Sequence, residues 1–230
     1  MRVGAKTDIG KVREVNEDSY GYHGRLFVLA DGMGGHEAGE IASAIAVETV
    51  LAADLGDAPT TRLHQAILDA NRAILAEVEK HPEHAGMGTT INVLYLDITQ
   101  AYITNVGDSR IYRLSGGRLK QLTADDSLVA QLVKNGSITE EEAKVHPRPN
   151  VLIQALGMEG NLEFEVTTVG IAPGDKFLLC SDGLTGMLDE KTITSYLDAD
   201  MAPQSIAEQL VGAADEAGGR DNITVIVVEV

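Results

Sequence analysis

The chain is poor in cysteine, in basic residues and in long apolar runs, and each shortage excludes a class of protein. Its 230 residues contain one cysteine, Cys180, so no intrachain disulfide can form and nothing indicates an oxidising compartment. Lysine and arginine number 18 against 35 aspartates and glutamates, which gives a net charge of −17. Because no basic cluster can neutralise a phosphate backbone or an anionic bilayer, we expect no nucleic-acid partner.

Membrane segments are also missing from the sequence. No apolar run approaches the ~20 residues that cross a bilayer, and the N-terminus lacks the apolar stretch of a signal peptide. We therefore expect a cytoplasmic protein with no membrane segment. With 44% hydrophobic residues, 24 glycines and 6 prolines the chain is typical of a folded protein. No repeat or linker divides it, so we expect one domain over residues 1–230.

The spacing of apolar residues predicts both helices and strands. Recurrence every three or four positions predicts helices near 38–53, 61–80 and 203–216. Short runs rich in β-branched residues predict strands at 25–30, 89–96, 101–106, 111–114, 176–180 and 223–230. Gly116 and Gly117 form a two-residue hairpin turn in this interpretation, so neighbouring strands pair antiparallel. Strands grouped apart from helices indicate an α+β fold, with antiparallel sheets covered by helices.

Residues 123–157 differ from the rest and are expected to be an insertion over the main body. Two capping-box patterns, Thr123 with Asp126 and Thr139 with Glu142, predict short helices that begin there. A proline-broken loop follows them.

Aspartates at strand ends are the most informative feature. Asp31, Asp108 and Asp182 each follow a predicted strand, and Asp221 precedes one, all with glycines nearby. A single Asp-Gly pair is usually only a turn. Four of them at strand ends are expected to gather at one edge of a packed sheet structure. Carboxylates brought that close repel one another unless cations lie between them, and an all-oxygen set suits Mg²⁺ or Mn²⁺ better than zinc.

Upstream of these acids, Arg13, Glu17 and Asp18 lie within six residues of one another. They are either a solvated charged loop or part of the same site. In the second case Arg13 would bind a phosphate dianion through its planar guanidinium, and Asp18 would hold a water molecule.

Six motifs along the chain resemble those of a known protein family. The matching motifs, in order, are Arg13-x-x-Asn16-Glu17-Asp18, Asp31-Gly32-Met33-Gly34-Gly35-His36, Gly88-Thr89-Thr90, Asn105-Val106-Gly107-Asp108-Ser109-Arg110, Ser181-Asp182-Gly183-Leu184 and Gly219-Arg220-Asp221-Asn222-Ile223-Thr224. They closely resemble the metal-dependent protein phosphatases of type 2C in their compact bacterial form. The resemblance covers essentially the whole chain.

The resemblance implies a fold and a metal centre. The fold is a central β-sandwich of two antiparallel sheets flanked by helices on both sides (αββα), with residues 123–157 as the flap that influences substrate choice. In the metal centre Asp31 bridges two metals, Mn²⁺ or Mg²⁺, and the carbonyl of Gly32 binds one of them. Asp182 and Asp221 complete the ligands of the other metal. Asp108 and Asp182 match the positions that hold a third, weaker metal.

The resemblance also implies a reaction. A water molecule that bridges two metals attacks phosphorus directly, while Arg13 binds the phosphate and Asp18 orients the water. The substrates are phosphoserine and phosphothreonine in proteins, and the partners include a bacterial serine/threonine kinase of the eukaryotic type. A monomer is expected. We further expect Glu17, His36 and Asn222 to lie beside these residues.

Two positions depart from relatives in the family. Met33 stands where many eukaryotic relatives have a histidine proposed to protonate the leaving alcohol, and His36 is either its substitute or a structural residue. Asp126 stands where relatives usually have the histidine of an Asp-His-Ser sequence, so we expect altered substrate handling with catalysis retained.

Other functional classes fit less well. A catalytically silent, phosphoprotein-binding relative is the alternative, but such domains typically lose metal-binding acids, and Asp31, Asp182 and Asp221 are all present. A cysteine phosphatase would need an arginine six residues after Cys180, where Gly186 stands. The chain contains neither an EF-hand calcium loop nor the lysine of a nucleotide-binding P-loop.

Overall fold

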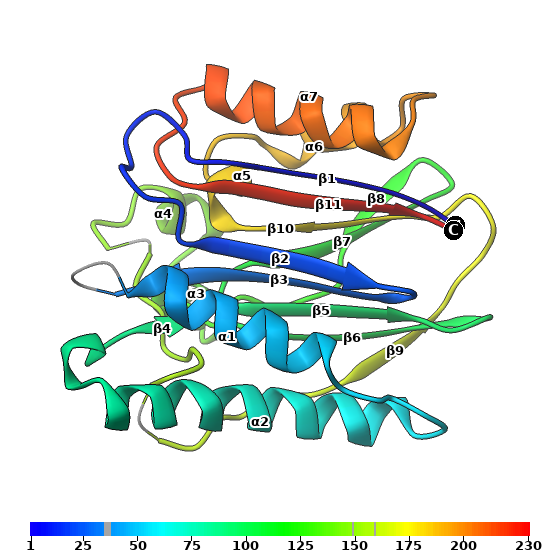
Figure 1. Cartoon of the computed structure of the whole chain (residues 1–230). Coiled ribbons are helices and arrows are strands. Elements are labelled where there is room, and N and C mark those ends of the chain that lie inside the picture. Colours follow the sequence, from blue (N-terminus) through cyan, green and yellow to red (C-terminus); the bar gives the residue numbers. More distant parts are fainter. Residues whose placement is uncertain (35–37, 149, 159) are drawn as a thin grey trace.

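Two antiparallel β-sheets face each other in the computed structural model, which describes residues 1–34, 38–148, 150–158 and 160–230 (Figure 1). One sheet has the order β1-β11-β10-β7-β8, from strands β1 (Arg2–Asp8), β7 (Arg110–Ser115), β8 (Arg118–Gln121), β10 (Lys176–Cys180) and β11 (Ile223–Glu229). The other has the order β2-β3-β5-β6-β9, from β2 (Asp18–His23), β3 (Leu26–Met33), β5 (Ile91–Leu96), β6 (Gln100–Val106) and β9 (Thr167–Gly170). The short strand β4 (Gly88–Thr89) pairs with β3.

Helices cover the outer face of each sheet. Helices α1 (Gly39–Leu51) and α2 (Pro59–Lys80) pack on the sheet that contains β3, and α6 (Glu190–Leu197) and α7 (Pro203–Glu216) pack on the sheet that contains β11 (Figure 1). The short helices α3 (Leu128–Lys134), α4 (Glu140–Lys144) and α5 (Asp182–Thr185) lie near the end of the sandwich where β3 and β10 finish. The predicted αββα sandwich is confirmed.

Alternating side chains build this layered core. In β3, Phe27 and Leu29 point between the two sheets, whereas Val28 and Ala30 point toward α1 and α2. This alternation follows from the two-residue period of a strand, and because both faces of β3 are covered its first five residues, Leu26 to Ala30, are all apolar. In β11, Ile226 lies in the central layer while Val225 packs beneath α7.

The predicted elements agree with the structure in most places. The three predicted helices are α1, α2 and α7, and Gly116 and Gly117 form the β7–β8 hairpin turn with φ angles of 54° and 74°. Glycine adopts these left-handed values without the steric penalty of a side chain. The capping box of Thr139 with Glu142 begins α4 as expected.

Two local predictions are wrong. No helix begins at Thr123, because its hydroxyl accepts a hydrogen bond from the Ile111 amide, and Ser127 caps α3 instead. Asp31 does not follow β3 but lies within it, because β4 pairs with Gly32 and Met33 and extends the strand.

No helix in the described part of the chain is long and apolar enough to cross a membrane.

Candidate active site

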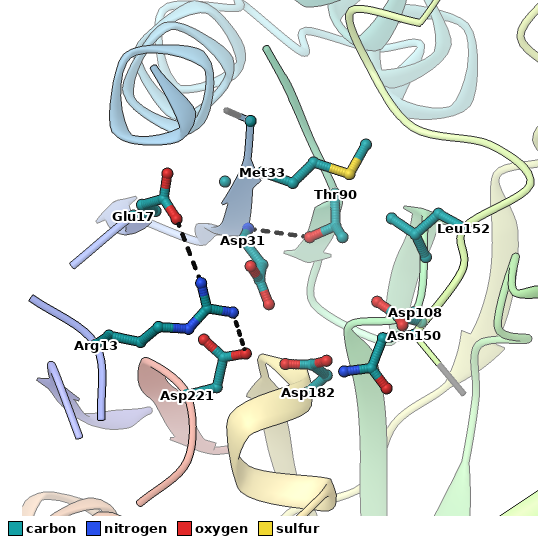
Figure 2. A pocket seen from close by; sticks show the side chains of 12 residues that line it. Arg13, Glu17, Asp31, Met33, Thr90, Asp108, Asn150, Leu152, Asp182 and Asp221 are labelled. Carbon is teal, nitrogen blue, oxygen red and sulfur yellow. Dashed lines mark hydrogen bonds and ion pairs between the residues drawn. The ribbon is translucent and has the colours of Figure 1, made fainter. Parts of the chain in front are cut away.

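The four predicted strand-end aspartates and Glu17 line one cavity at the end of the sandwich. The cavity has a volume of about 170 Å³. Figure 2 shows Asp31, Asp182 and Asp221 directed into the same space, with Asp108 farther along and Arg13 on the opposite side. These residues come from different parts of the chain: Asp31 from β3, Asp108 from the turn after β6, Asp182 from the start of α5 and Asp221 from the residues before β11. The sandwich therefore brings these strand-end aspartates together.

Hydrogen bonds with Thr89 and Thr90, where β4 ends and β5 begins, fix the backbone of Asp31. The Asp31 carbonyl accepts hydrogen bonds from the Thr90 amide at 2.9 Å and the Thr89 hydroxyl at 2.9 Å. The Asp31 amide donates to Thr90 Oγ1 at 3.0 Å, and that oxygen is 2.8 Å from Ser109 Oγ (Figure 2). The Gly88-Thr89-Thr90 motif thus orients Asp31.

Gly32 lies where no side chain fits. A Cβ at this position would be 2.2 Å from the Gly39 carbonyl oxygen and 2.5 Å from that of Glu17. The Gly32 amide donates to the Glu17 carbonyl at 3.1 Å. Close backbone approach here holds β3, α1 and the loop before β2 together at the cavity wall.

Asp18 lies behind Asp31 and is not among the residues that line the cavity. The two aspartates are cross-strand partners between β2 and β3. Asp18 Oδ2 accepts a hydrogen bond from Ser181 Oγ at 2.8 Å, while Oδ1 is buried without a partner among the described residues. Ser181 precedes Asp182, so this hydrogen bond links Asp18 to the segment that carries Asp182.

Arg13 pairs with acids at the mouth of the cavity. Its Nη2 is 2.7 Å from Asp221 Oδ2, and its Nη1 is 3.9 Å from Glu17 Oε2 (Figure 2). The hydrogen bond that Arg13 donates to Asp221 raises the pKa of the Arg13 guanidinium. The side chain remains 47% exposed, so it is accessible to an anion that enters from solvent.

Asn222 holds the loop that carries Arg13. Its side-chain amide donates to the carbonyls of Ile9 and Val15 at 3.0 Å each, and its Oδ1 accepts from the Glu17 amide at 2.8 Å. Asn222 is 4% exposed. Both N–H donors and the carbonyl oxygen of one buried amide are therefore used to fix residues 9–17 against the start of β11.

Burial and mutual repulsion perturb the carboxylates. Burial raises the pKa of Asp18 and of Asp108 to about 7 and the pKa of Asp182 to about 6, and neighbouring aspartates shift each in the same direction. Burial followed by the charge of Asp18 raises the pKa of Asp31 well above its usual value. Several carboxylates in so small a volume are unfavourable as anions unless positive charge compensates them.

The donor set fits hard divalent cations. In the described part of the chain, no three His, Cys, Asp or Glu side chains form a metal-binding group as they stand. The oxygens of Asp31, Asp182 and Asp221 nevertheless face one cavity, and Asp18 Oδ1 behind them lacks a partner. Carboxylate and carbonyl oxygens are the ligands of Mg²⁺ and Mn²⁺.

The structure adds cavity residues that the sequence did not reveal. Asn150 and Leu152, from the segment predicted to be the flap, line the cavity opposite Arg13 (Figure 2). A strand-end pattern could not indicate them, because they lie in an irregular loop. Thr90 also lines the cavity, and here the Thr-Thr pair was a usable signal. His36, predicted to lie nearby, is outside the described residues.

The two sequence departures have different surroundings. Met33 lines the cavity, where its thioether can neither donate nor accept a proton. Asp126 does not line it: its Oδ2 accepts hydrogen bonds from the Gly107 amide at 3.0 Å and Gln154 Nε2 at 3.3 Å. The neighbouring Asp125 pairs with Arg110 through three hydrogen bonds of 2.7 to 3.1 Å.

Cys180 takes no part in this site. It is completely buried in β10, and burial raises the pKa of its thiol to about 12. A thiol in that state is neither a thiolate nor accessible, so the structure supports the rejection of a cysteine phosphatase.

A cluster of carboxylates with one accessible arginine at the edge of a β-sandwich defines a class of metal-dependent phosphoryl hydrolases, and the comparisons agree. The family model described as protein phosphatase 2C matches residues 11–215. The serine/threonine phosphatase stp of Listeria welshimeri is 39% identical over all of this chain and 96% of that protein. The serine/threonine protein phosphatase PstP of Mycobacterium tuberculosis is 40% identical over all of this chain and 45% of that longer protein.

Solved structures give the same result. The crystal structure of the Mycobacterium tuberculosis serine/threonine phosphatase PstP/Ppp superposes with a TM-score of 0.94 at 39% identity, over all of this chain and 98% of the other. A catalytic domain of PstP in complex with two manganese ions gives 0.90 at 38% identity, over 99% and 97% of the chains.

The chain belongs to the protein phosphatase 2C family. It is a serine/threonine protein phosphatase, a metal-dependent hydrolase that acts on phosphoproteins. The catalytically silent alternative is disfavoured.

Proposed function

We propose that residues 1–230 form one catalytic domain that hydrolyses phosphoserine and phosphothreonine esters in proteins at the cavity between Asp31, Asp182 and Asp221. The observation that supports this most directly is the placement of four aspartates and Arg13 around one small cavity. Residues 123–157 form the flap beside it, and through Asn150 and Leu152 this segment contributes to the cavity wall.

We assign the cations to these oxygens. Asp31 and the Gly32 carbonyl, together with Asp182 and Asp221, hold two core Mn²⁺ or Mg²⁺ ions. Asp108 and Asp182 hold a third, weaker one. When bound, such ions supply a water molecule that ionises near neutral pH and positive charge that offsets the charge of the phosphate.

Arg13 is the residue of the chain that binds the phosphate. Its guanidinium lies at the mouth of the cavity, and among the described residues its short contact is with Asp221, through Nη2. A phosphate dianion can accept two parallel N–H hydrogen bonds, so the phosphate of the substrate competes with Asp221 for the Arg13 guanidinium. Arg13 thereby orients the ester with its phosphorus toward the carboxylate cluster.

Asp18, Glu17 and Asn222 act by positioning. Asp18 would orient the water molecule that the cations supply; it accepts a hydrogen bond from Ser181 and is the cross-strand partner of Asp31 on the adjacent strand. Glu17 faces one edge of Arg13, and Asn222 fixes the loop that carries both. Because Met33 has no exchangeable proton, the leaving alkoxide receives its proton from a group other than residue 33.

Several expectations stay predictions. They are the cognate kinase as a partner, the monomeric state and the cytoplasmic location. The altered substrate handling expected from Asp126 also stays a prediction, and the second cavity described below gives it a structural setting.

Hydrolysis of p-nitrophenyl phosphate and of a phosphothreonine peptide tests the proposed function. We expect phosphate release with Mn²⁺ or Mg²⁺ and none in excess EDTA, with activity restored when metal is added back. Release that continues undiminished in EDTA would refute the assignment of the carboxylates as metal ligands. No release from folded protein with metal bound would instead favour a phosphoprotein-binding role.

Replacing Arg13 by alanine is expected to raise KM for a phosphothreonine peptide about tenfold, and to lower kcat less, because the lost charged hydrogen bonds serve ground-state binding. Arg13→Lys should recover part of the loss, since it keeps the charge without the planar pair of donors. Arg118→Ala, an exposed arginine of the β7–β8 hairpin, is the control. An unchanged KM in Arg13→Ala would contradict the role.

A further inference from the structure

A second cavity lies along the outer edge of β6. Strand β6 continues to Val106, but its neighbour β9 pairs with it only as far as Ile103, which faces Thr167 (Figure 1). Beyond that pair, Thr104 and Asn105 face a cavity of about 240 Å³. This volume exceeds that of the cavity between the aspartates, and among the described residues the two cavities share no lining residue.

The charge on the walls of this cavity is of one sign. Asp126, Glu163 and Glu165 line it, and the described lining includes no lysine, arginine or histidine. In the part of the chain that the structure describes, none of the three forms an ion pair. Apolar side chains, among them Leu122 and Phe164, complete the walls.

A buried polar atom without a partner lies in the same wall. Thr104 is 2% exposed, and its Oγ1 has no hydrogen-bond partner among the described residues. Of the two Asp126 oxygens, Oδ2 accepts from Gly107 and Gln154, whereas Oδ1 accepts from none of the described residues. A buried polar atom without a partner is unfavourable, so Thr104 Oγ1 marks a position that a hydrogen-bond donor would satisfy.

We propose that this cavity binds the side chain of a lysine or arginine in the phosphoprotein substrate, an inference that rests on the proposed function. The apolar walls at Leu122 and Phe164 suit the aliphatic part of such a side chain, and the three carboxylates suit its charge. A bare metal ion would gain nothing from the apolar walls. An ammonium group carries three donors, and the acceptors without a described partner in this wall are Asp126 Oδ1 and the buried Thr104 Oγ1.

The second cavity is joined to the first by a short connection. The amide of Gly107 donates to Asp126 Oδ2 at 3.0 Å, and the amide of Asp126 donates to the Gly107 carbonyl at 2.9 Å. The next residue, Asp108, lines the first cavity. An extended peptide whose phosphate occupies the first cavity can therefore place a basic residue, a few positions away, in the second.

The experiment compares matched phosphothreonine peptides that carry either lysine or glutamine at one position, scanned from two to six residues on each side of the phosphothreonine. KM and kcat are measured with the full chain and Mn²⁺, p-nitrophenyl phosphate turnover is measured in parallel, and peptide affinity is read by fluorescence anisotropy. For the best position we expect the lysine peptide to have a KM about fivefold lower at low salt, a preference that declines as salt is raised.

The double variant Glu163→Gln/Glu165→Gln should bring this KM ratio to near one, with kcat and p-nitrophenyl phosphate turnover unchanged. The control is Glu208→Gln/Glu216→Gln, which makes the same charge change on exposed positions of α7, over the opposite sheet, and should keep the preference. An equal KM for lysine and glutamine peptides at every position overturns the inference, as does a preference that survives in the double variant. If the wild type does not hydrolyse p-nitrophenyl phosphate, the proposed function fails. Fluorescence anisotropy would then still show whether the second cavity favours the lysine peptide over the glutamine peptide.

Discussion

Replacing Asp182 by asparagine is expected to lower phosphate release on the order of 10³-fold while the fold is retained. The side chain keeps its shape and volume, and it lies at the start of α5, where its carboxylate faces the cavity and not the apolar core. The substitution removes one anionic oxygen donor from the set assigned to the cations. It also removes one of the charges that raise the pKa of Asp31 and Asp108.

Because the substitution removes a repulsive charge, a stability measurement can distinguish a loss of catalysis from a folding defect. Because Asp182 is buried among like charges, metal-free Asp182→Asn protein should be at least as stable as the metal-free wild type at pH 8. Thermal unfolding in EDTA measures this, and isothermal titration with Mn²⁺ should show weaker binding. Asp57→Asn, an exposed aspartate between α1 and α2, serves as the control for loss of a carboxylate. Full activity in Asp182→Asn would contradict the metal assignment.

The central strands of the fold were predictable because they are buried on both faces. β3, β5, β10 and β11 are each built around a mostly apolar run, which marks their position in the sequence, although composition did not show that β3 extends through Asp31 to Met33. The strands that escaped prediction, β1, β2 and β9, are all at sheet edges. An edge strand has one unpaired side and carries polar residues that prevent aggregation, so a search for apolar runs misses it. α6 also escaped prediction, because eight residues hold barely two turns of helical period.

The candidate site was predictable to the extent that it is built from strand ends. Asp31, Asp108, Asp182 and Asp221 converge because antiparallel strands in two stacked sheets finish at a common edge. The sequence could not place Asp18 behind Asp31, since that depends on the register between β2 and β3. It also could not place Asp126 at a second cavity, since that depends on β9 ending before β6 does.

In the absence of metal, the stability of the protein should fall as pH rises from about 5.5 to 8. Burial raises the pKa of Asp182 from 3.8 to about 6 and that of Asp18 and Asp108 to about 7, so over this range the folded state holds protons that the unfolded state has already released. A state that binds more protons loses relative stability as pH rises, and the loss is complete once pH exceeds the folded pKa values. A shift of about two units corresponds to about 3 kcal/mol for one group.

Thermal unfolding of EDTA-treated protein at pH 5.5, 6.5 and 8 measures this effect, and Tm should drop by on the order of 5–10 °C across the series. Saturating Mn²⁺ should remove the drop, because cations bind best to the ionised carboxylates and stabilise the folded state most at high pH. Asp182→Asn should show a shallower drop in EDTA, since one of the perturbed groups no longer titrates. Carboxylates with ordinary pKa values have finished ionising below pH 5.5, so they do not contribute within this window. A metal-free Tm that stays flat or rises toward pH 8 would mean that the aspartates do not repel one another in solution, and the electrostatic reason for placing cations between them would be lost.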